Sequence, residues 1–240
     1  MTPAEVLTVI RGDETAPRLT FYDDEPGPTR GERIELSAKV LANWVAKAGN
    51  LLQEEFDAGP GTAVGLDLPA HHWRTLYWAL AAWSVGATVR LDDPARADVV
   101  VTDNPREDTG DGGTAPAQLV VVTLASLARM CPNPLPSGAI DEAADLLTYA
   151  DHFDAWDTAA DGDVALIAAD GRQTAYGDLV PEVTGAHGRR VYLEAPDGAD
   201  LLLDALRVWA ADGSIVIVRD PDPTAIDRRL ESEGASPERA

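Results

Sequence analysis

The sequence predicts an α/β protein made of two related βαβ-type halves with largely parallel sheets. Two observations lead to this prediction. Short β-prone runs alternate with segments whose apolar residues recur at helical spacing, and the short connections between them are typical of parallel strands joined by helices. A helix, a glycine and a strand also recur in the same order in the two parts of the chain. We assign residues 1–130 to the first half, 131–221 to the second half, and 222–240 to a frayed C-terminal tail in which proline and charge dominate.

The first half contains alternating strands and helices. Ser37 is a typical helix N-cap, and the apolar residues after it lie on one helical face. Gly86 ends the second helix. In chain order, the expected elements are strands at 19–22 and 32–36, a helix at 37–52, a strand at 63–68, a helix at 73–84, and strands at 87–91, 97–101 and 118–123. Residues 105–116 are rich in Asp, Gly and Thr and are expected to form a mobile surface loop.

The second half follows the same alternation. Three prolines between residues 130 and 138 predict an irregular crossing. The expected elements are a short helix at 140–147, strands at 164–168 and 191–194, a helix at 201–209 and a last strand at 214–219. Between the first two of these strands, Asp170-Gly171 is a turn signal of the hairpin kind.

An internal repeat relates the two halves. The segment that starts at Leu80 (LAAWSVGATV) aligns with the segment that starts at Leu206 (LRVWAADGSIV), after one inserted residue. A chance match between apolar helices explains any single similarity, but the common order of several similarities favours a duplication. Two similar halves that face each other would enclose a cleft.

Composition and charge restrict the partners and the compartment. The chain of 240 residues has 41 acidic and 19 basic side chains, which gives a formal net charge of −22. This balance argues against nucleic acid or an anionic membrane as a partner. The single Cys131 excludes a disulfide framework and a cysteine-based zinc site, and it suits a reducing compartment. No run approaches the ~20 apolar residues of a membrane span and no secretory signal is visible, so we expect a soluble, cytoplasmic protein.

Four sequence motifs resemble a known superfamily. They are Leu19-Thr-Phe-Tyr-Asp23, Leu36-Ser37 before the long helix, Gly61-Thr-Ala-Val-Gly-Leu-Asp-Leu-Pro69, and Trp83-Ser-Val-Gly86-Ala-Thr-Val89. Together they resemble the N-terminal part of adenylate-forming (AMP-binding, acyl-CoA synthetase-like) enzymes, strongly as far as Asp93 and more weakly to Val218. The chain is similar to a branch of short actinobacterial proteins of unknown function that is distantly related to this superfamily. The resemblance implies a truncated N-terminal domain and concerns the fold more than the activity.

The chemistry of the superfamily depends on residues that this chain lacks. The resemblance implies a Ser/Thr/Gly-rich phosphate loop ending in Lys-Gly, a Thr-Glu pair, a Tyr…Gly-Asp motif and a lysine in a small C-terminal domain. Residues 169–175, Ala-Asp-Gly-Arg-Gln-Thr-Ala, stand in place of the phosphate loop. There is no Thr-Glu dipeptide, and the only lysines are Lys39 and Lys47. Thr109-Gly110-Asp111 precedes the loop position and is interpreted as a chance match. We therefore assign no catalytic residue, no metal ligand and no cofactor; AMP or ATP is implied by the resemblance alone.

Two segments are candidate ligand contacts. His71 and His72 stand where a strand ends and a helix begins, a place where free amides gather. Capping of the helix together with packing of Trp73 is the alternative explanation. The second segment comprises Asp170, Gly171, Arg172, Gln173 and Thr174, in which Arg172 could meet an anion. A simple hairpin turn is the alternative there.

Two functions of different classes follow from these observations. The first is a degenerate, non-catalytic relative of adenylate-forming enzymes that binds a small ligand, such as a nucleotide, an adenylate or an acyl group. The alternative is a protein-interaction or regulatory module, for example a homodimer, with no small-molecule ligand. If a small molecule binds, we expect it to contact the loop after strand 164–168 together with His71 or His72.

Overall fold

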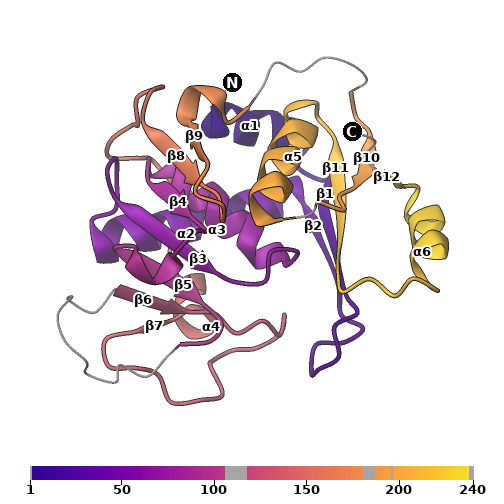
Figure 1. Cartoon of the computed structure of the whole chain (residues 1–240), viewed down its shortest axis with the longest axis horizontal. Coiled ribbons are helices and arrows are strands. Elements are labelled where there is room, and N and C mark those ends of the chain that lie inside the picture. The colour runs from indigo at the N-terminus through magenta and orange to yellow at the C-terminus, as the bar shows by residue number, and fades with distance from the viewer. Residues whose placement is uncertain (1, 106–117, 181–186, 196, 238–240) are drawn as a thin grey trace.

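The fold consists of two mainly parallel sheets with helices between them. The computed structural model describes residues 2–105, 118–180, 187–195 and 197–237, and its elements are shown in Figure 1. Within these residues, sheet A has the strand order β12 (Ser236–Pro237), β10 (Arg190–Tyr192), β11 (Ser214–Arg219), β1 (Pro17–Asp23) and β2 (Arg33–Ser37). Sheet B has the order β7 (Ile140–Asp141), β6 (Gln118–Val121), β5 (Val99–Thr102), β3 (Ala63–Asp67), β4 (Thr88–Arg90), β8 (Val164–Ile167) and β9 (Gln173–Ala175).

The strand pairings are parallel except at two edges. Within the described residues, β2 pairs antiparallel with β1, and β9 pairs antiparallel with β8. The other pairings, including β1 with β11 and β3 with both β4 and β5, are parallel. The predicted α/β class with largely parallel sheets is therefore confirmed.

The helices lie mainly between the sheets. They are α1 (Pro3–Ile10), α2 (Ala38–Phe56), α3 (Trp73–Ser84), α4 (Glu142–Asp145), α5 (Gly198–Ala210) and α6 (Ile226–Glu233), with 3₁₀ turns η1 (Pro94–Arg96), η2 (Leu146–Thr148) and η3 (Tyr176–Asp178). Helix α3 contacts β1 of sheet A and β3 and β4 of sheet B. In Figure 1, α3 and α5 occupy the middle of the molecule, and α6 lies on the far side of sheet A.

Helix starts follow local sequence signals. The hydroxyl of Ser37 accepts a hydrogen bond from the amide of Val40, which confirms the predicted cap of α2. Helix α1 was not predicted, although Thr2 and Glu5 form a complete capping box at its start. Its apolar residues Val6 and Ile10 are fully buried, so tertiary packing stabilises this short helix.

The C-terminal segment differs from the frayed tail that was expected for residues 222–240. As far as Pro237 it contains α6 and β12, and charged side chains fasten α6 to sheet A. Arg229 binds Asp24 at 2.7 Å, and Glu233 accepts hydrogen bonds from Arg190 at 2.5 Å and from Tyr22. Local composition could not reveal these partners, because they lie about 40 to 200 residues away in the sequence.

Each sheet combines strands from residues 1–130 with strands from 131–221. In sheet A, β1 lies next to β11, and in sheet B, β4 lies next to β8. The internal repeat relates α3 and β4 to α5 and β11. Its two strands belong to different sheets, β4 to sheet B and β11 to sheet A. The sheets therefore do not separate at residue 130, while the division into two related halves stays a prediction.

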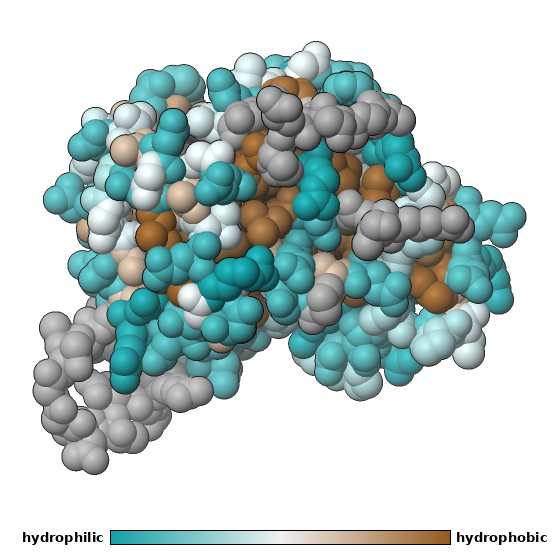
Figure 2. All heavy atoms as spheres, turned by 45° about the horizontal axis from the view of Figure 1, so that its top comes forward, coloured by the Kyte–Doolittle hydropathy of each residue, from teal (hydrophilic) through white to brown (hydrophobic). Residues whose placement is uncertain are grey.

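The surface agrees with the acidic composition. In Figure 2, hydrophilic residues cover most of the periphery of the face shown, whereas apolar residues gather near its middle. Exposed large apolar side chains elsewhere in the described residues include Leu127, Met130 and Trp156. Isolated exposure of this kind is normal for a folded protein.

Gly65 permits a close contact that we expect to be sensitive to substitution. A Cβ placed on Gly65 would lie 2.3 Å from the carbonyl oxygen of Pro94 in η1, so a side chain would push η1 away from β3. We expect Gly65→Ala to lower the free energy of unfolding by about 1–3 kcal/mol, the usual cost of overpacking. Urea unfolding at 25 °C measures this change. Gly162→Ala is the control, because its Cβ would have no heavy atom within 4 Å; equal stability of the two variants would contradict the prediction.

Candidate functional site

The carboxyl ends of parallel strands from both sheets meet near the start of α5. A Cβ placed on Gly198 would lie 3.5 Å from Cβ of Ala70, which follows β3, and 3.5 Å from Cδ1 of Leu91, which follows β4. His71 interacts with the backbone of Ala195, which follows β10. Helix N-termini and the carboxyl ends of parallel strands are where ligands bind in α/β folds. The fold thus places His71 in such a position.

His72 is fully buried and caps α3. Its Nδ1 accepts a hydrogen bond from the amide of Arg74 at 3.3 Å, and its ring packs edge-on against Phe21 with the centroids 4.7 Å apart. Its Nε2 faces the backbone of Leu124 without a hydrogen bond of normal geometry among the described residues. Burial, aided by the positive charges of Arg74 and Arg219, lowers the pKa of His72 to about 3. The ring is therefore neutral at pH 7 and performs the capping role that was the alternative explanation.

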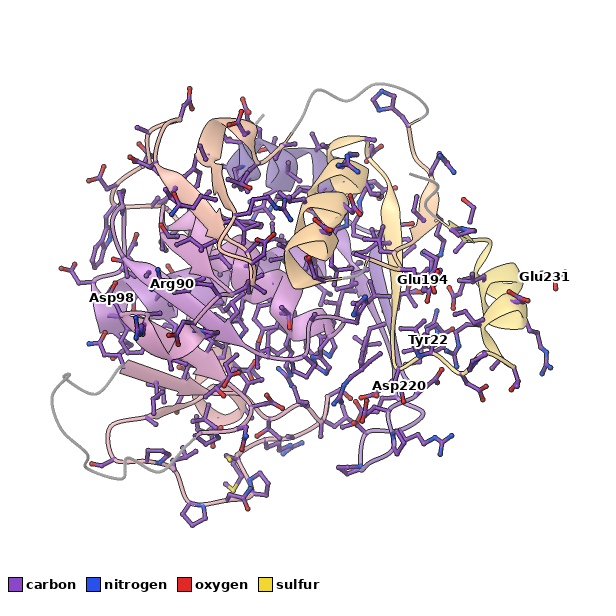
Figure 3. All side chains as sticks on the ribbon, in the orientation of Figure 1. Tyr22, Arg90, Asp98, Glu194, Asp220 and Glu231 are labelled. Atoms are coloured by element: carbon purple, nitrogen blue, oxygen red, sulfur yellow. The ribbon has the colours of Figure 1, made fainter. Side chains whose placement is uncertain are left out.

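His71 is half-buried and offers hydrogen bonding without charge. Burial lowers the pKa of its ring, against the opposing effects of the Ala195 backbone and the Glu194 carboxylate. Glu194, labelled in Figure 3, lies two residues after the end of β10. A ring with a lowered pKa is mainly neutral at pH 7. His71 can consequently donate or accept one hydrogen bond at this position.

Residues 168–172 form a closed hairpin turn between β8 and β9. The amide of Gly171 donates to the carbonyl of Ala168 at 2.8 Å, and the amide of Ala168 donates to the carbonyl of Arg172 at 2.9 Å. The amide of Arg172 donates to Oδ1 of Asp170 at 2.9 Å. Gly171 has a φ of 83°, in the left-handed region that glycine adopts without strain. These three amides are therefore already used within the turn.

The guanidinium of Arg172 is paired with acidic side chains. Its Nη2 lies 3.0 Å from Oδ1 of Asp200 in the first turn of α5, and its Nε lies 3.9 Å from Asp170. The hydrogen bond to Asp200 is the main reason that the pKa of Arg172 is raised. Gln173 is exposed and Thr174 is half-buried, both on β9. Arg172 and His71 thus approach the same end of α5, the former through Asp200.

Arg74 and Glu142 form a buried ion pair that was not predicted from the sequence. Nη1 of Arg74 lies 2.5 Å from Oε1 of Glu142, with side chains 2% and 0% exposed, and the hydroxyl of Tyr77 donates to the same oxygen. Nε of Arg74, Oε2 of Glu142 and Nε1 of Trp73 have no hydrogen-bond partner among the described residues. Buried polar atoms of this kind normally bind ordered water. The position of Arg74 in an otherwise apolar helix could have indicated this pair, because a buried charge requires a partner.

Neither a metal-binding cluster nor a membrane-spanning helix occurs in the part of the chain that the structure describes. There, no group of three or more His, Cys, Asp and Glu side chains is arranged to hold a metal ion. No helix of the described residues combines the length and apolar character needed to cross a membrane. The Thr109-Gly110-Asp111 string lies outside the described residues.

Comparison with known proteins identifies one relative over nearly the whole chain. A TIGR03089 family protein of Mycobacterium tuberculosis (strain ATCC 25618 / H37Rv) is 35% identical over 234 residues, which cover 94% of this chain and 92% of that protein. No protein-family model matches the sequence.

Solved structures with the same fold are adenylate-forming enzymes. The acyl-CoA synthetase of Brucella canis (TM-score 0.73, 14% identity) matches 98% of this chain and 46% of its own. The acetoacetyl-CoA synthetase of Streptomyces lividans (0.70, 17%) matches 98% and 41%. Klebsiella oxytoca NpsA in complex with 3-hydroxyanthranilyl-AMSN (0.65, 14%) matches 98% and 46%. The chain therefore spans less than half the length of these enzymes, and the likeness at this identity concerns the fold.

Because His72 is buried and neutral, we expect the free energy of unfolding to fall in acid. The unfolded chain binds a proton at His72 near pH 6.5, whereas the folded chain does so only near pH 3. The contribution of the neutral ring to the free energy of unfolding is therefore complete above pH 6.5 and is lost as the pH falls towards 3. At pH 5 this loss is about 2 kcal/mol. His72→Asn keeps a capping oxygen but has no titrating group. We expect the unfolding free energy of the wild type to fall about 2 kcal/mol further than that of His72→Asn between pH 7 and pH 5, measured with urea; parallel curves would contradict this.

Proposed function

The chain belongs to the TIGR03089 protein family and has the fold of the N-terminal domain of adenylate-forming enzymes; from this premise, we propose that it is a non-catalytic relative that binds a small ligand. The observation that carries the proposal is the closed hairpin turn at residues 168–172. In the superfamily that this chain resembles, the corresponding loop cradles triphosphate oxygens with amides and a cation. Such a cradle stabilises developing charge only when its donors are free and correctly placed.

The hairpin offers few free donors to a triphosphate. The amides of Ala168, Gly171 and Arg172 are bound within the turn, and the carboxylates of Asp170 and Asp200 surround the only guanidinium. A triphosphate would have to displace these contacts while facing two negative charges. This arrangement supports loss of acid activation.

The proposed ligand site lies where His71 and residues 170–174 approach the first turn of α5. The structure of NpsA in complex with 3-hydroxyanthranilyl-AMSN motivates an adenylate-like ligand, a nucleotide or an acyl group. An anionic part of such a ligand would bind Arg172 after displacing Asp200, and His71 would supply a neutral hydrogen bond. Arg172 and Asp200 are both substantially exposed, so their ion pair is weak enough to exchange.

A protein-interaction or regulatory module is the second candidate. It is supported by an acidic groove on the outer face of sheet B, whose lining includes Asp67 and Asp103. A homodimer is one form that this module could take. Light scattering at several concentrations measures the oligomeric state directly.

We expect no acid activation by this chain. Pyrophosphate–ATP exchange with a panel of aliphatic and aromatic carboxylic acids should stay at the level of a blank without protein. The physical reason is the absence of free cationic and amide donors in the hairpin turn. Acid-dependent exchange above the blank, abolished by Arg172→Ala, would disprove a non-catalytic role.

The charge balance at Arg172 should control the affinity for an anionic ligand. We expect Asp200→Asn to raise the affinity for AMP about two- to fivefold, because it frees the guanidinium from a surface ion pair. Arg172→Ala should lower this affinity by at least a similar factor. Isothermal titration calorimetry with AMP measures both changes.

Arg129→Ala is the matched control for this experiment. Arg129 is an exposed arginine outside the proposed site, so its loss changes the net charge by the same amount. If this control weakens AMP binding as much as Arg172→Ala does, the ligand responds to overall charge and the site is misplaced.

A further inference from the structure

We propose that a groove on the outer face of sheet B binds an extended, arginine- or lysine-containing segment of a partner protein. The groove consists of two hollows of about 250 Å³ and 480 Å³ that share Asn104. Asp67, Thr102 and Leu119 belong to the first hollow, and Asp103 and Leu135 to the second. We call these six residues and the space between them the outer groove. It is separate from the proposed ligand site at α5, and it rests on the second of the two proposed functions.

The outer groove lies at the point where the strand order of sheet B reverses. From β3, the chain passes through α3 to β4 on one side, and then returns to β5 on the other side of β3. Asp67 is the last residue of β3, and Thr102 is the last residue of β5. Crevices at the carboxyl ends of strands next to such a reversal are the usual binding places of open α/β sheets.

Prolines make the walls of the groove rigid. Pro94 of η1 lines the first hollow, and its carbonyl approaches β3 so closely that only a glycine fits at position 65. Two further prolines, Pro134 and Pro136, line the second hollow. Proline restricts the backbone, so these walls are preorganised for a partner.

The groove carries carboxylates that form no ion pair among the described residues. Asp92 and Asp93, which also line the first hollow, have arginines at 3.1 Å and 3.0 Å. In contrast, Asp67 accepts a hydrogen bond only from Thr102, and within the described residues neither Asp67 nor Asp103 forms an ion pair. Burial raises the pKa of Asp103 and the nearby charge of Asp67 adds to the effect, whereas the positive charge of Arg219 opposes it.

The shape and lining favour a peptide over a bare ion. The cross-strand neighbours Val100 and Leu119 form an apolar floor in the first hollow. The methylene stem of arginine or lysine can lie on such a floor while its charged end meets a carboxylate. Within the described residues the carboxylates do not form a metal-binding group. The net charge of −22 would also accelerate the encounter with a basic partner.

Fluorescence anisotropy with a labelled hexapeptide of alternating alanine and arginine tests the proposal at 50 mM salt. The same peptide with citrulline in place of arginine keeps the shape and removes the charge. We expect saturable binding of the arginine peptide and at least tenfold weaker binding of the citrulline peptide. The double variant Asp67→Asn/Asp103→Asn should weaken binding of the arginine peptide at least tenfold.

Two further variants keep the test decisive. Asp178→Asn/Asp227→Asn removes the same charge from exposed positions outside the groove, and it should change the affinity less than twofold. Asn104→Lys places a positive charge at an exposed position between the two hollows and should abolish binding even if the double variant fails to fold. Urea midpoints show whether each variant is folded.

Three results would overturn the proposal: no saturable binding of the arginine peptide, equal effects of the groove variant and its control, or full competition by 1 mM magnesium or spermidine. The last result would mean a small-cation site in place of a peptide groove. None of these results bears on acid activation or on AMP binding, which are measured separately. Failure of the groove can therefore be distinguished from failure of the proposed ligand site.

Discussion

Burial of α3 between the two sheets is the constraint on which the rest of the structure depends. Eleven of its twelve residues are buried, because β1 packs against one side and β3 and β4 against another. A helix in this position must be apolar all round, which explains its three tryptophans. The same burial forces Arg74 to find Glu142 and Tyr77, and it forces His72 to remain neutral. The chemistry around α3 is therefore dictated first by solvent exclusion.

Carboxylates govern what the remaining arginines can do. Arg172 is held by Asp200, Arg229 by Asp24, and Arg190 by Glu233. In a chain with about twice as many acidic as basic side chains, an arginine in the described regions commonly meets a carboxylate before it meets a ligand. An anionic ligand must compete with these partners, whereas a cationic group finds carboxylates such as Asp67, which forms no ion pair among the described residues. The charge balance thus favours different ligands at the two proposed sites.

Local features could be predicted from the sequence, and distant pairings could not. Some features depend only on residues that are neighbours in the sequence, so a short segment is enough to predict them. They are the Ser37 cap, the Asp170-Gly171 hairpin and the alternation of strands and helices. The docking of α6 and the Arg74–Glu142 pair depend on residues that meet only after folding. For the candidate site, sequence position indicated that His71 and Arg172 follow strand ends, but only the structure brings Asp200 to Arg172. The outer groove was missed because it is formed by strand ends and loops that are separate in the sequence.

The strands of sheet A come from distant parts of the sequence, which affects how this protein folds during its synthesis. Its central strands β1 and β11 are almost two hundred residues apart in the sequence, and β10 also belongs to the late part of the chain. During translation, β1 therefore leaves the ribosome long before its parallel neighbour exists. Until then, the apolar side of β1 and the helices that pack on it have no complete sheet to cover them. Contacts of such high sequence separation also slow folding. Chaperones that shield nascent chains should consequently engage this protein chiefly through its early strands, and release it only after β11 has been made.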